Sequence, residues 1–131
     1  MKLLLDTHVV LWWLLDDRRL SRKARSMIES LDNRIAVSAA SLWETAVKEA
    51  RSKTSLKAAA VLSGLKESGF DLMPITAEHA VQVSDLPPHH GDPFDRMLVA
   101  QARHEGCALV TRDRALSPYA ALIPGDGLVL I

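Results

Sequence analysis

The 131-residue sequence is poor in cysteine: Cys107 is its only one, so no disulfide forms within the chain. A chain without a disulfide framework is typical of proteins that fold in a reducing compartment, which favours a cytoplasmic location. The apolar run Ala108-Leu109-Val110 follows at once. This pattern indicates a buried strand and an inert, structural thiol.

An excess of charge is also missing, because 16 Lys and Arg residues balance 16 Asp and Glu residues. The balance excludes a protein that binds polyanions through its overall charge, so any contact with nucleic acid must come from local basic clusters. Three clusters occur, at residues 18–25, 48–57 and 112–114. Each of them, taken alone, is more typical of a solvated helix face than of a binding surface.

No apolar run is long enough to cross a bilayer. The apolar start of the chain is interrupted by Asp6 and His8 and ends at Asp16-Asp17 without a small-residue cleavage site, which argues against a signal peptide. We therefore expect no membrane contact. With 48% hydrophobic and 24% charged residues, the sequence predicts one globular domain over residues 1–131.

Short apolar runs alternate with segments of helical periodicity along the whole chain. We expect strands at residues 3–5, 34–38, 108–111 and 128–131, and a short extended segment at 70–75. We expect helices at about 7–15, 21–31, 41–50, 56–67, 77–84 and 92–106. Strands that alternate with helices predict an α/β fold, in which a mostly parallel sheet is covered on both faces.

Capping residues predict where several helices begin. Ser41, with Glu44 three residues later, matches a capping box and predicts a helix start at Ser41. Thr76 is a second candidate N-cap. The pair Asp92-Pro93 combines a favoured N-cap with proline at the first helical position, so it predicts a sharply defined start.

Four acidic residues are predicted to meet at one edge of the sheet. Asp6 and Asp113 follow expected parallel strands, whose carboxyl ends share an edge, and Glu44 and Asp95 are both expected in the first turn of helices that begin there. Carboxylates ~5 Å apart repel by about 3 kcal/mol at an effective dielectric constant near 20. Such a cluster needs either raised pKa values or a bound divalent cation.

The chemistry of these side chains indicates which cation and which reaction. Ligands that are all oxygen favour Mg²⁺ or Mn²⁺ over Zn²⁺. Such ions suit phosphate substrates and supply an activated water, which points to metal-assisted hydrolysis of phosphodiesters. Each acid also has a structural interpretation: Asp95 as a helix-dipole partner, Glu44 as part of a capping box and Asp113 as a turn residue. Asp92 is assigned mainly to capping.

The tryptophans allow two interpretations. Trp12, Trp13 and Trp43 could stack on RNA bases, but all three lie in apolar helical stretches, which favours packing in the core or at an interface. Trp12 and Trp13 are adjacent, so they cannot both point straight into the core.

Two further groups of polar residues lie close to the acids in sequence. The loop pair His89-His90 could coordinate a metal or help in proton transfer, but a pair in a loop before a helix start is more typical of solvated side chains. Its position beside Asp92 leaves phosphate contact open. Arg112 and Arg114 flank Asp113 and are candidates for phosphate contacts, with plain surface charge as the alternative.

Four sequence blocks together resemble a known family, the PIN-domain ribonucleases, and most closely the VapC toxins of bacterial toxin–antitoxin systems. The blocks are LLLDTHVVLWWL, VSAASLWETAVKEA, GDPFDRMLVAQA and ALVTRDRAL, in this order. Each block alone is weakly specific. Their order and spacing make the resemblance strong, and it extends over nearly the whole chain.

The resemblance implies a compact three-layer α/β/α domain and a Mg²⁺- or Mn²⁺-dependent endoribonuclease. By position it implies an acidic site of Asp6, Glu44, Asp95 and Asp113, with direct metal ligation by Asp6, Asp95 and Asp113 and Glu44 acting through water. Thr7 and Thr111 fit hydroxyls that orient the cluster or the substrate. It also implies a homodimer and a cognate antitoxin that occupies the groove beside the acids.

Other classes fit the sequence less well. A non-catalytic member of the same fold is the main alternative, and the presence of all four acids argues against it. A phosphotransfer receiver domain requires paired acids after the first strand and a late lysine, but no lysine follows Lys66. A haloacid-dehalogenase-type phosphatase requires Asp-x-Asp, where this chain has Asp6-Thr7-His8.

Overall fold

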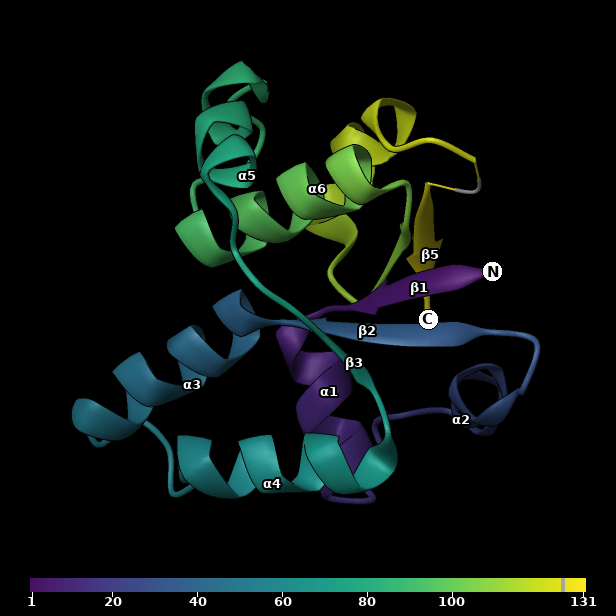
Figure 1. The fold of residues 1–131 in the computed structure, drawn as a ribbon, viewed down its shortest axis with the longest axis vertical. Helices are drawn as coiled ribbons and strands as arrows, with labels where there is room; N and C mark the ends of the chain where they lie inside the picture. The colour runs from purple at the N-terminus through teal and green to yellow at the C-terminus, as the bar shows by residue number, and fades with distance from the viewer. Residues whose placement is uncertain (126) are drawn as a thin grey trace.

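The centre of the molecule is a five-stranded parallel sheet in the order β3-β2-β1-β4-β5, seen in a computed structural model that describes residues 1–125 and 127–131 (Figure 1). All four neighbouring pairs are parallel, as the alternation of strands and helices predicts. The strands are β1 (Lys2–Leu5), β2 (Arg34–Ser38), β3 (Asp71–Met73), β4 (Ala108–Thr111) and β5 (Leu128–Leu130).

Helices cover both faces of this sheet, which confirms the three-layer α/β/α architecture. Figure 1 shows α1, α2 and α4 on one side of the sheet and α5 and α6 on the other. The helices are α1 (Thr7–Leu14), α2 (Arg22–Glu29), α3 (Ala39–Ala50), α4 (Ala58–Ser68), α5 (Ala77–Gln82) and α6 (Pro93–Glu105), with 3-10 segments η1 (Val83–Asp85) and η2 (Arg114–Leu122). None of the helices in the described part of the chain is long and apolar enough to span a membrane.

Alternating side chains of β1 build two separate cores. Leu4 points into a core shared with Leu98 of α6, whereas Leu3 and Leu5 point into the opposite core with Leu65 of α4. All five of these side chains are fully buried. The central strand is therefore apolar on both faces from Leu3 to Leu5, and the polar residue Asp6 follows directly after its end.

The register of the three central strands brings their carboxyl ends together. Leu5 is level with Val37 of β2 and with Val110 of β4. The amide of Asp6 continues the ladder by donating to the Val110 carbonyl at 2.9 Å. Residues that follow β1, β2 and β4 therefore emerge side by side at one edge of the sheet.

The predicted N-cap of α3 was wrong by three residues, because Ser38 rather than Ser41 caps this helix. The Ser38 hydroxyl accepts a hydrogen bond from the Ala40 amide at 2.9 Å and donates to Oε1 of Gln101 at 2.5 Å. Ser41 is buried within the helix. Glu44 consequently lies in the second turn and does not close a capping box with Ser41.

Other predicted helix ends agree with the structure. The Asp92 carboxylate accepts from the amides of Phe94 and Asp95 at 2.8 and 3.1 Å, with Pro93 as the first helical residue. Thr76 caps α5. Gly106 ends α6 with a φ of 68°, a left-handed conformation that glycine adopts without strain. The segment η2 was not predicted as an element.

Candidate active site

Asp6 is the acid at the centre of the candidate site. It follows β1 directly, is only 3% exposed, and accepts a hydrogen bond from the Thr111 hydroxyl at 2.5 Å. Burial raises the pKa of Asp6 above its ordinary value, and the hydrogen bond from Thr111 only partly opposes this effect. A negative charge at this position is therefore costly in the protein without a cation.

Asp95 responds most strongly to the cluster. It lies in the first turn of α6, and burial together with the charges of Asp6, Asp92 and Glu44 raises its pKa to about 7, against the influence of His90. These charges act on Asp95 from three separate parts of the chain. Asp6 and Glu44 therefore lie close enough to Asp95 to act on its charge, and the raised pKa is one of the two consequences expected of clustered acids.

Glu44 reaches the same region from α3 and is 5% exposed. Its Oε2 accepts from the Lys48 ammonium at 2.8 Å, one helical turn away. Its Oε1 is buried and has no hydrogen-bond partner among the described residues. An orphaned buried carboxylate oxygen costs free energy unless a donor or a cation meets it, so this atom marks the cluster as incomplete.

Asp113 joins the cluster from the segment that follows β4. Its amide donates to the Thr111 hydroxyl oxygen at 3.0 Å, and its Oδ1 caps η2 by accepting from the Ala115 amide at 2.9 Å. The other oxygen, Oδ2, lies 3.2 Å from Nε2 of His90. Asp113 is thus a turn residue, as one of the two interpretations predicts, and its second carboxylate oxygen faces the cluster.

His90 is the residue that the sequence interpretation missed. We expected a solvated loop, but the side chain is only 18% exposed and its Nε2 lies 3.2 Å from Asp113 and 3.6 Å from Asp95. One polar atom from each of these three residues lies within 4.8 Å of the others. The only local signal was its position beside the Asp92 cap. Its neighbour His89 is exposed, with its ring 5.3 Å from that of Tyr119.

The two predicted hydroxyls have different contacts. Thr111 bridges Asp6 and Asp113, because its hydroxyl donates to one carboxylate and accepts from the other residue's amide. The Thr7 hydroxyl instead donates to the Ser41 hydroxyl at 2.9 Å, which ties the start of α1 to α3. Thr111 therefore touches the acids directly, and Thr7 supports the adjoining helices.

Arg112 and Arg114, the two candidates for phosphate contacts, have different surroundings in the structure. Arg112 donates to the Arg19 carbonyl at 2.7 Å, and its guanidinium lies over the Trp12 ring at 5.6 Å. Arg114 is exposed at the start of η2, next to Asp113. The guanidinium of Arg112 is engaged in these two contacts, whereas the exposed side chain of Arg114 is open to a ligand.

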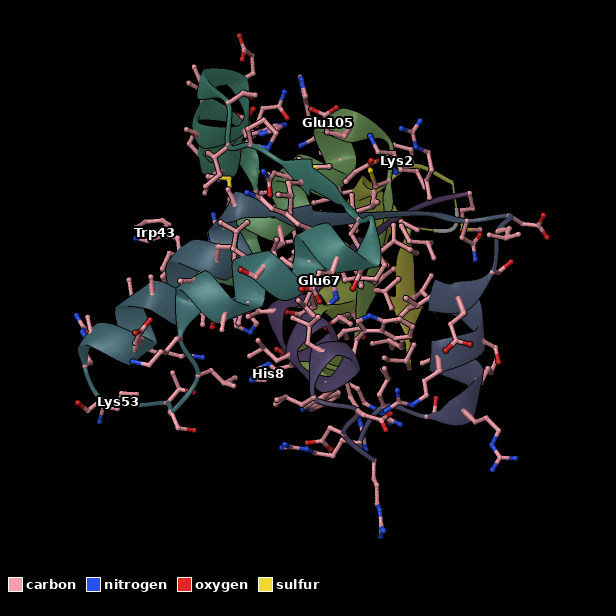
Figure 2. The ribbon with its side chains drawn as sticks, turned by 60° about the horizontal axis from the view of Figure 1, so that its bottom comes forward. Lys2, His8, Trp43, Lys53, Glu67 and Glu105 are labelled. Carbon is pink, nitrogen blue, oxygen red and sulfur yellow. The ribbon has the colours of Figure 1, made fainter. Side chains whose placement is uncertain are left out.

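The tryptophans also separate into two kinds. Trp12 and Trp13 are partly buried against the core beneath α1, as the packing interpretation predicts. Trp43 is 55% exposed and projects outward from α3 (Figure 2). Its ring meets the Phe94 ring edge-on at 4.9 Å, so an aromatic pair links α3 and α6 beside the acids.

The donor set of the cluster fits a hard divalent cation. Three carboxylates from different elements converge, and a fourth, Glu44, contributes a buried oxygen without a partner. Oxygen ligands of this type suit Mg²⁺ and Mn²⁺. A cation would offset the burial and the repulsion that together raise the pKa of Asp95. The residues present are therefore chemically suited to hold a metal ion.

A second group with metal-ligand chemistry, His79, His104 and Glu105, lies between α5 and the end of α6. His79 is fully buried and serves the Thr76 capping box: its Nδ1 accepts the Thr76 amide at 3.1 Å. Its ring proton therefore lies on Nε2, which donates to Glu105 at 2.8 Å. Both ring nitrogens are engaged, so the geometry favours a structural role.

Comparison with known proteins gives matches over nearly the whole chain. A family model described as PIN domain matches residues 3–122. The chain is 38% identical to Ribonuclease VapC22 of Mycobacterium tuberculosis over 121 residues, which are 88% of this chain and 90% of that protein. These matches confirm the resemblance to VapC proteins that the four sequence blocks indicated.

Solved structures show the same fold at lower identity. The structure of VapBC2 from Rickettsia felis bound to a DNA fragment from its promoter aligns with a TM-score of 0.71, at 20% identity and with coverage of 100% and 99% of the two chains. VapBC-5 of Mycobacterium tuberculosis, described as a toxin–antitoxin system, aligns with a TM-score of 0.60, at 18% identity and with coverage of 99% and 98%. Given this fold, the family match and the clustered acids, the chain belongs to the PIN-domain family.

Proposed function

We propose that the protein is a Mg²⁺- or Mn²⁺-dependent endoribonuclease that hydrolyses RNA phosphodiester bonds at the four-carboxylate cluster. The observation that carries the proposal is the electrostatic state of Asp95, whose pKa rises to about 7 largely because of burial and neighbouring acids. Carboxylates whose pKa values are strongly shifted by burial and neighbouring charges are candidates for functional sites. The name of its relative, Ribonuclease VapC22, supports RNA as the substrate.

Asp6, Asp95 and Asp113 are the proposed direct ligands. Glu44 would act through water, because Lys48 already holds its Oε2 and only Oε1 remains. A divalent cation bound there would polarise a phosphoryl oxygen and lower the pKa of a bound water. The protein's own part is to hold the carboxylates in place, and Thr111 does this by fixing Asp6 and the backbone of Asp113.

Substrate contacts are proposed for the polar residues around the cluster. Arg114, exposed beside Asp113, would bind a backbone phosphate. Arg112 would contribute long-range attraction and contact phosphate with those N–H groups that do not bond Arg19. Thr7 would act indirectly, by fixing the start of α1 against Ser41 next to Asp6.

The proposed biological role is that of the toxin in a type II toxin–antitoxin pair, acting in the cytoplasm. The descriptions of VapBC2 and VapBC-5, which share this fold, support a cognate antitoxin as partner. The antitoxin would occupy the groove beside the acids. We also propose a homodimer as the active form.

The test compares Asp6→Asn with the wild type in a Mn²⁺-dependent RNA cleavage assay. We expect the variant to fold normally and to lose cleavage, because a central ligand is replaced by a neutral amide. Glu67→Gln is the matched control: Glu67 is an exposed acid on α4 and should not affect cleavage (Figure 2). Cleavage by Asp6→Asn at the wild-type rate would contradict the assignment of the site, and absence of cleavage by the wild type with Mn²⁺ would favour the alternative, a non-catalytic PIN-fold binding partner.

A further inference from the structure

His90 enters the acid cluster from the loop between η1 and α6. Its Nε2 lies 3.2 Å from Oδ2 of Asp113 and 3.6 Å from Oδ2 of Asp95. The side chain is 18% exposed, so it is held mostly within the protein. It brings an imidazole nitrogen next to two of the clustered carboxylates.

The backbone fixes which nitrogen of His90 carries the proton. The Asp92 amide donates to Nδ1 at 3.1 Å, and an amide N–H only donates, so Nδ1 accepts. The proton of the neutral ring therefore lies on Nε2, which donates to Asp113. A protonated Nε2 has no lone pair for a metal, so His90 serves this site as a hydrogen-bond donor.

Both oxygens of Asp113 are oriented as a result. The Ala115 amide holds Oδ1 at 2.9 Å, and His90 holds Oδ2 on the side that faces Asp95. A carboxylate oxygen has room for one such hydrogen bond and a cation at the same time. The donor thus fixes the direction of the carboxylate without using up its capacity to bind metal.

A hydrogen-bond network holds the loop that carries His90. The fully buried Tyr119 accepts the His90 amide at 3.1 Å and donates to the Pro87 carbonyl at 2.8 Å. The Arg96 guanidinium donates to Tyr119 and Pro87, each at 3.0 Å, and to the carbonyls of Val83 and Leu86. Arg96 lies one position after Asp95, so the helix that presents the acid also anchors the loop.

We infer that His90 is a positioning residue that orients Asp113, through its Nε2–H donor, for cation binding at the acid cluster. The inference rests on the metal site of the proposed function. In this inference the loop at 86–92 is held in place by hydrogen bonds to Arg96 and Tyr119, and it brings His90 to Asp113. Partners of this kind, which orient a ligand without touching the metal, typically change affinity 10- to 100-fold when removed.

The test measures Mn²⁺ binding by isothermal titration calorimetry, without RNA, for the wild type, His90→Ala and His90→Gln. We expect His90→Ala to bind roughly 10- to 100-fold more weakly. His90→Gln should recover most of the affinity, because its amide nitrogen lies near the position of Nε2 and still donates. The control is His104→Ala, which removes an exposed imidazole in the last turn of α6, outside the cluster, and should bind as the wild type does.

Three results would overturn the inference: wild-type or tighter Mn²⁺ binding by His90→Ala, failure of His90→Gln to recover affinity, or ¹⁴N coupling in the electron spin echo spectrum of bound Mn²⁺ that shows direct ligation by His90. Circular dichroism establishes that each variant folds. If His90→Ala does not fold, Tyr119→Phe carries the test, since it removes the hydroxyl that holds the His90 amide and should weaken Mn²⁺ binding.

The proposed function and this inference fail separately. A wild-type protein that binds Mn²⁺ but leaves RNA intact would contradict the nuclease proposal and leave the role of His90 standing. RNA cleavage by the wild type together with unchanged Mn²⁺ binding by His90→Ala would support the nuclease proposal and contradict the role of His90.

Discussion

The Thr111 hydroxyl donates to Oδ2 of Asp6 at 2.5 Å across 105 positions of sequence. The same hydroxyl oxygen accepts the Asp113 amide at 3.0 Å. One small side chain therefore joins the acid that follows β1 to the acid that follows β4. Because Thr111 is the last residue of β4, the parallel register of the sheet sets this link directly.

Thr111→Val tests this link, since valine keeps the shape and removes the hydroxyl. We expect a loss of about 1–3 kcal/mol in the free energy of unfolding at neutral pH, because a buried carboxylate loses its donor. RNA cleavage should fall as well. Thr111→Ser, which keeps the hydroxyl, is the control and should stay close to the wild type in chemical denaturation. Equal stability and activity in Thr111→Val would show that the link is not needed.

The raised pKa of Asp95 predicts how stability depends on pH. Its pKa is about 7 in the folded protein and near 3.8 in the unfolded chain, so between these values the folded state binds more protons. Stability from this group is therefore full below about pH 4 and falls as the pH rises to about 7. Asp95→Asn removes the penalty.

In buffer with EDTA we expect Asp95→Asn to be more stable than the wild type at pH 8, by an amount of the order of a few kcal/mol. The difference should shrink towards zero at pH 4. Urea denaturation at the two pH values measures it. A variant that is less stable than the wild type at pH 8 would mean that Asp95 supports the fold and is not strained by its neighbours.

Metal removal and addition should change stability as well as activity. EDTA should stop RNA cleavage, and Mn²⁺ should restore it. Mn²⁺ at 100 times its dissociation constant should stabilise the folded wild type by about 2.7 kcal/mol, which a thermal melt detects. Asp6→Asn should show little of this stabilisation. Cleavage that persists in EDTA would remove the metal from the mechanism.

Arg114→Gln tests the proposed phosphate contact. We expect RNA binding to weaken similarly for all sequences, and the slope of log affinity against log salt to decrease by about 0.7, the value for one contact to a single strand. Fluorescence anisotropy measures RNA binding. Both proteins carry Asp6→Asn, so that the RNA is not cleaved during the measurement. Arg103→Gln, at an exposed arginine in the last turn of α6 outside the three basic clusters, is the control. An unchanged salt slope would place the phosphate contact elsewhere.

Local signals explain what the sequence predicted well. The Asp92-Pro93 pair, Thr76 and Gly106 each act on the backbone within a few residues, so their effects were visible without the fold. The acids that follow β1 and β4 were predictable for a related reason, since parallel strands must end at a common edge. These features require no knowledge of which side chains meet.

The errors arose where a distant partner decides the outcome. Ser38 and Ser41 are equally good caps by type, and the contact between Ser38 and Gln101, 63 positions away, accompanies the earlier start. His90 takes its role from Asp113, 23 positions further on, and from Tyr119. Tyr119 lies in η2, an irregular segment whose periodicity gave no prediction.

The central claim is that carboxylates from separate parts of the chain hold a divalent cation. The most direct measurement is a crystal structure of the protein soaked in Mn²⁺, with data collected near the manganese absorption edge. Our account predicts one strong anomalous peak among the carboxylate oxygens of Asp6, Asp95 and Asp113. A structure without a peak there, or with a peak only at His79, His104 and Glu105, would contradict it.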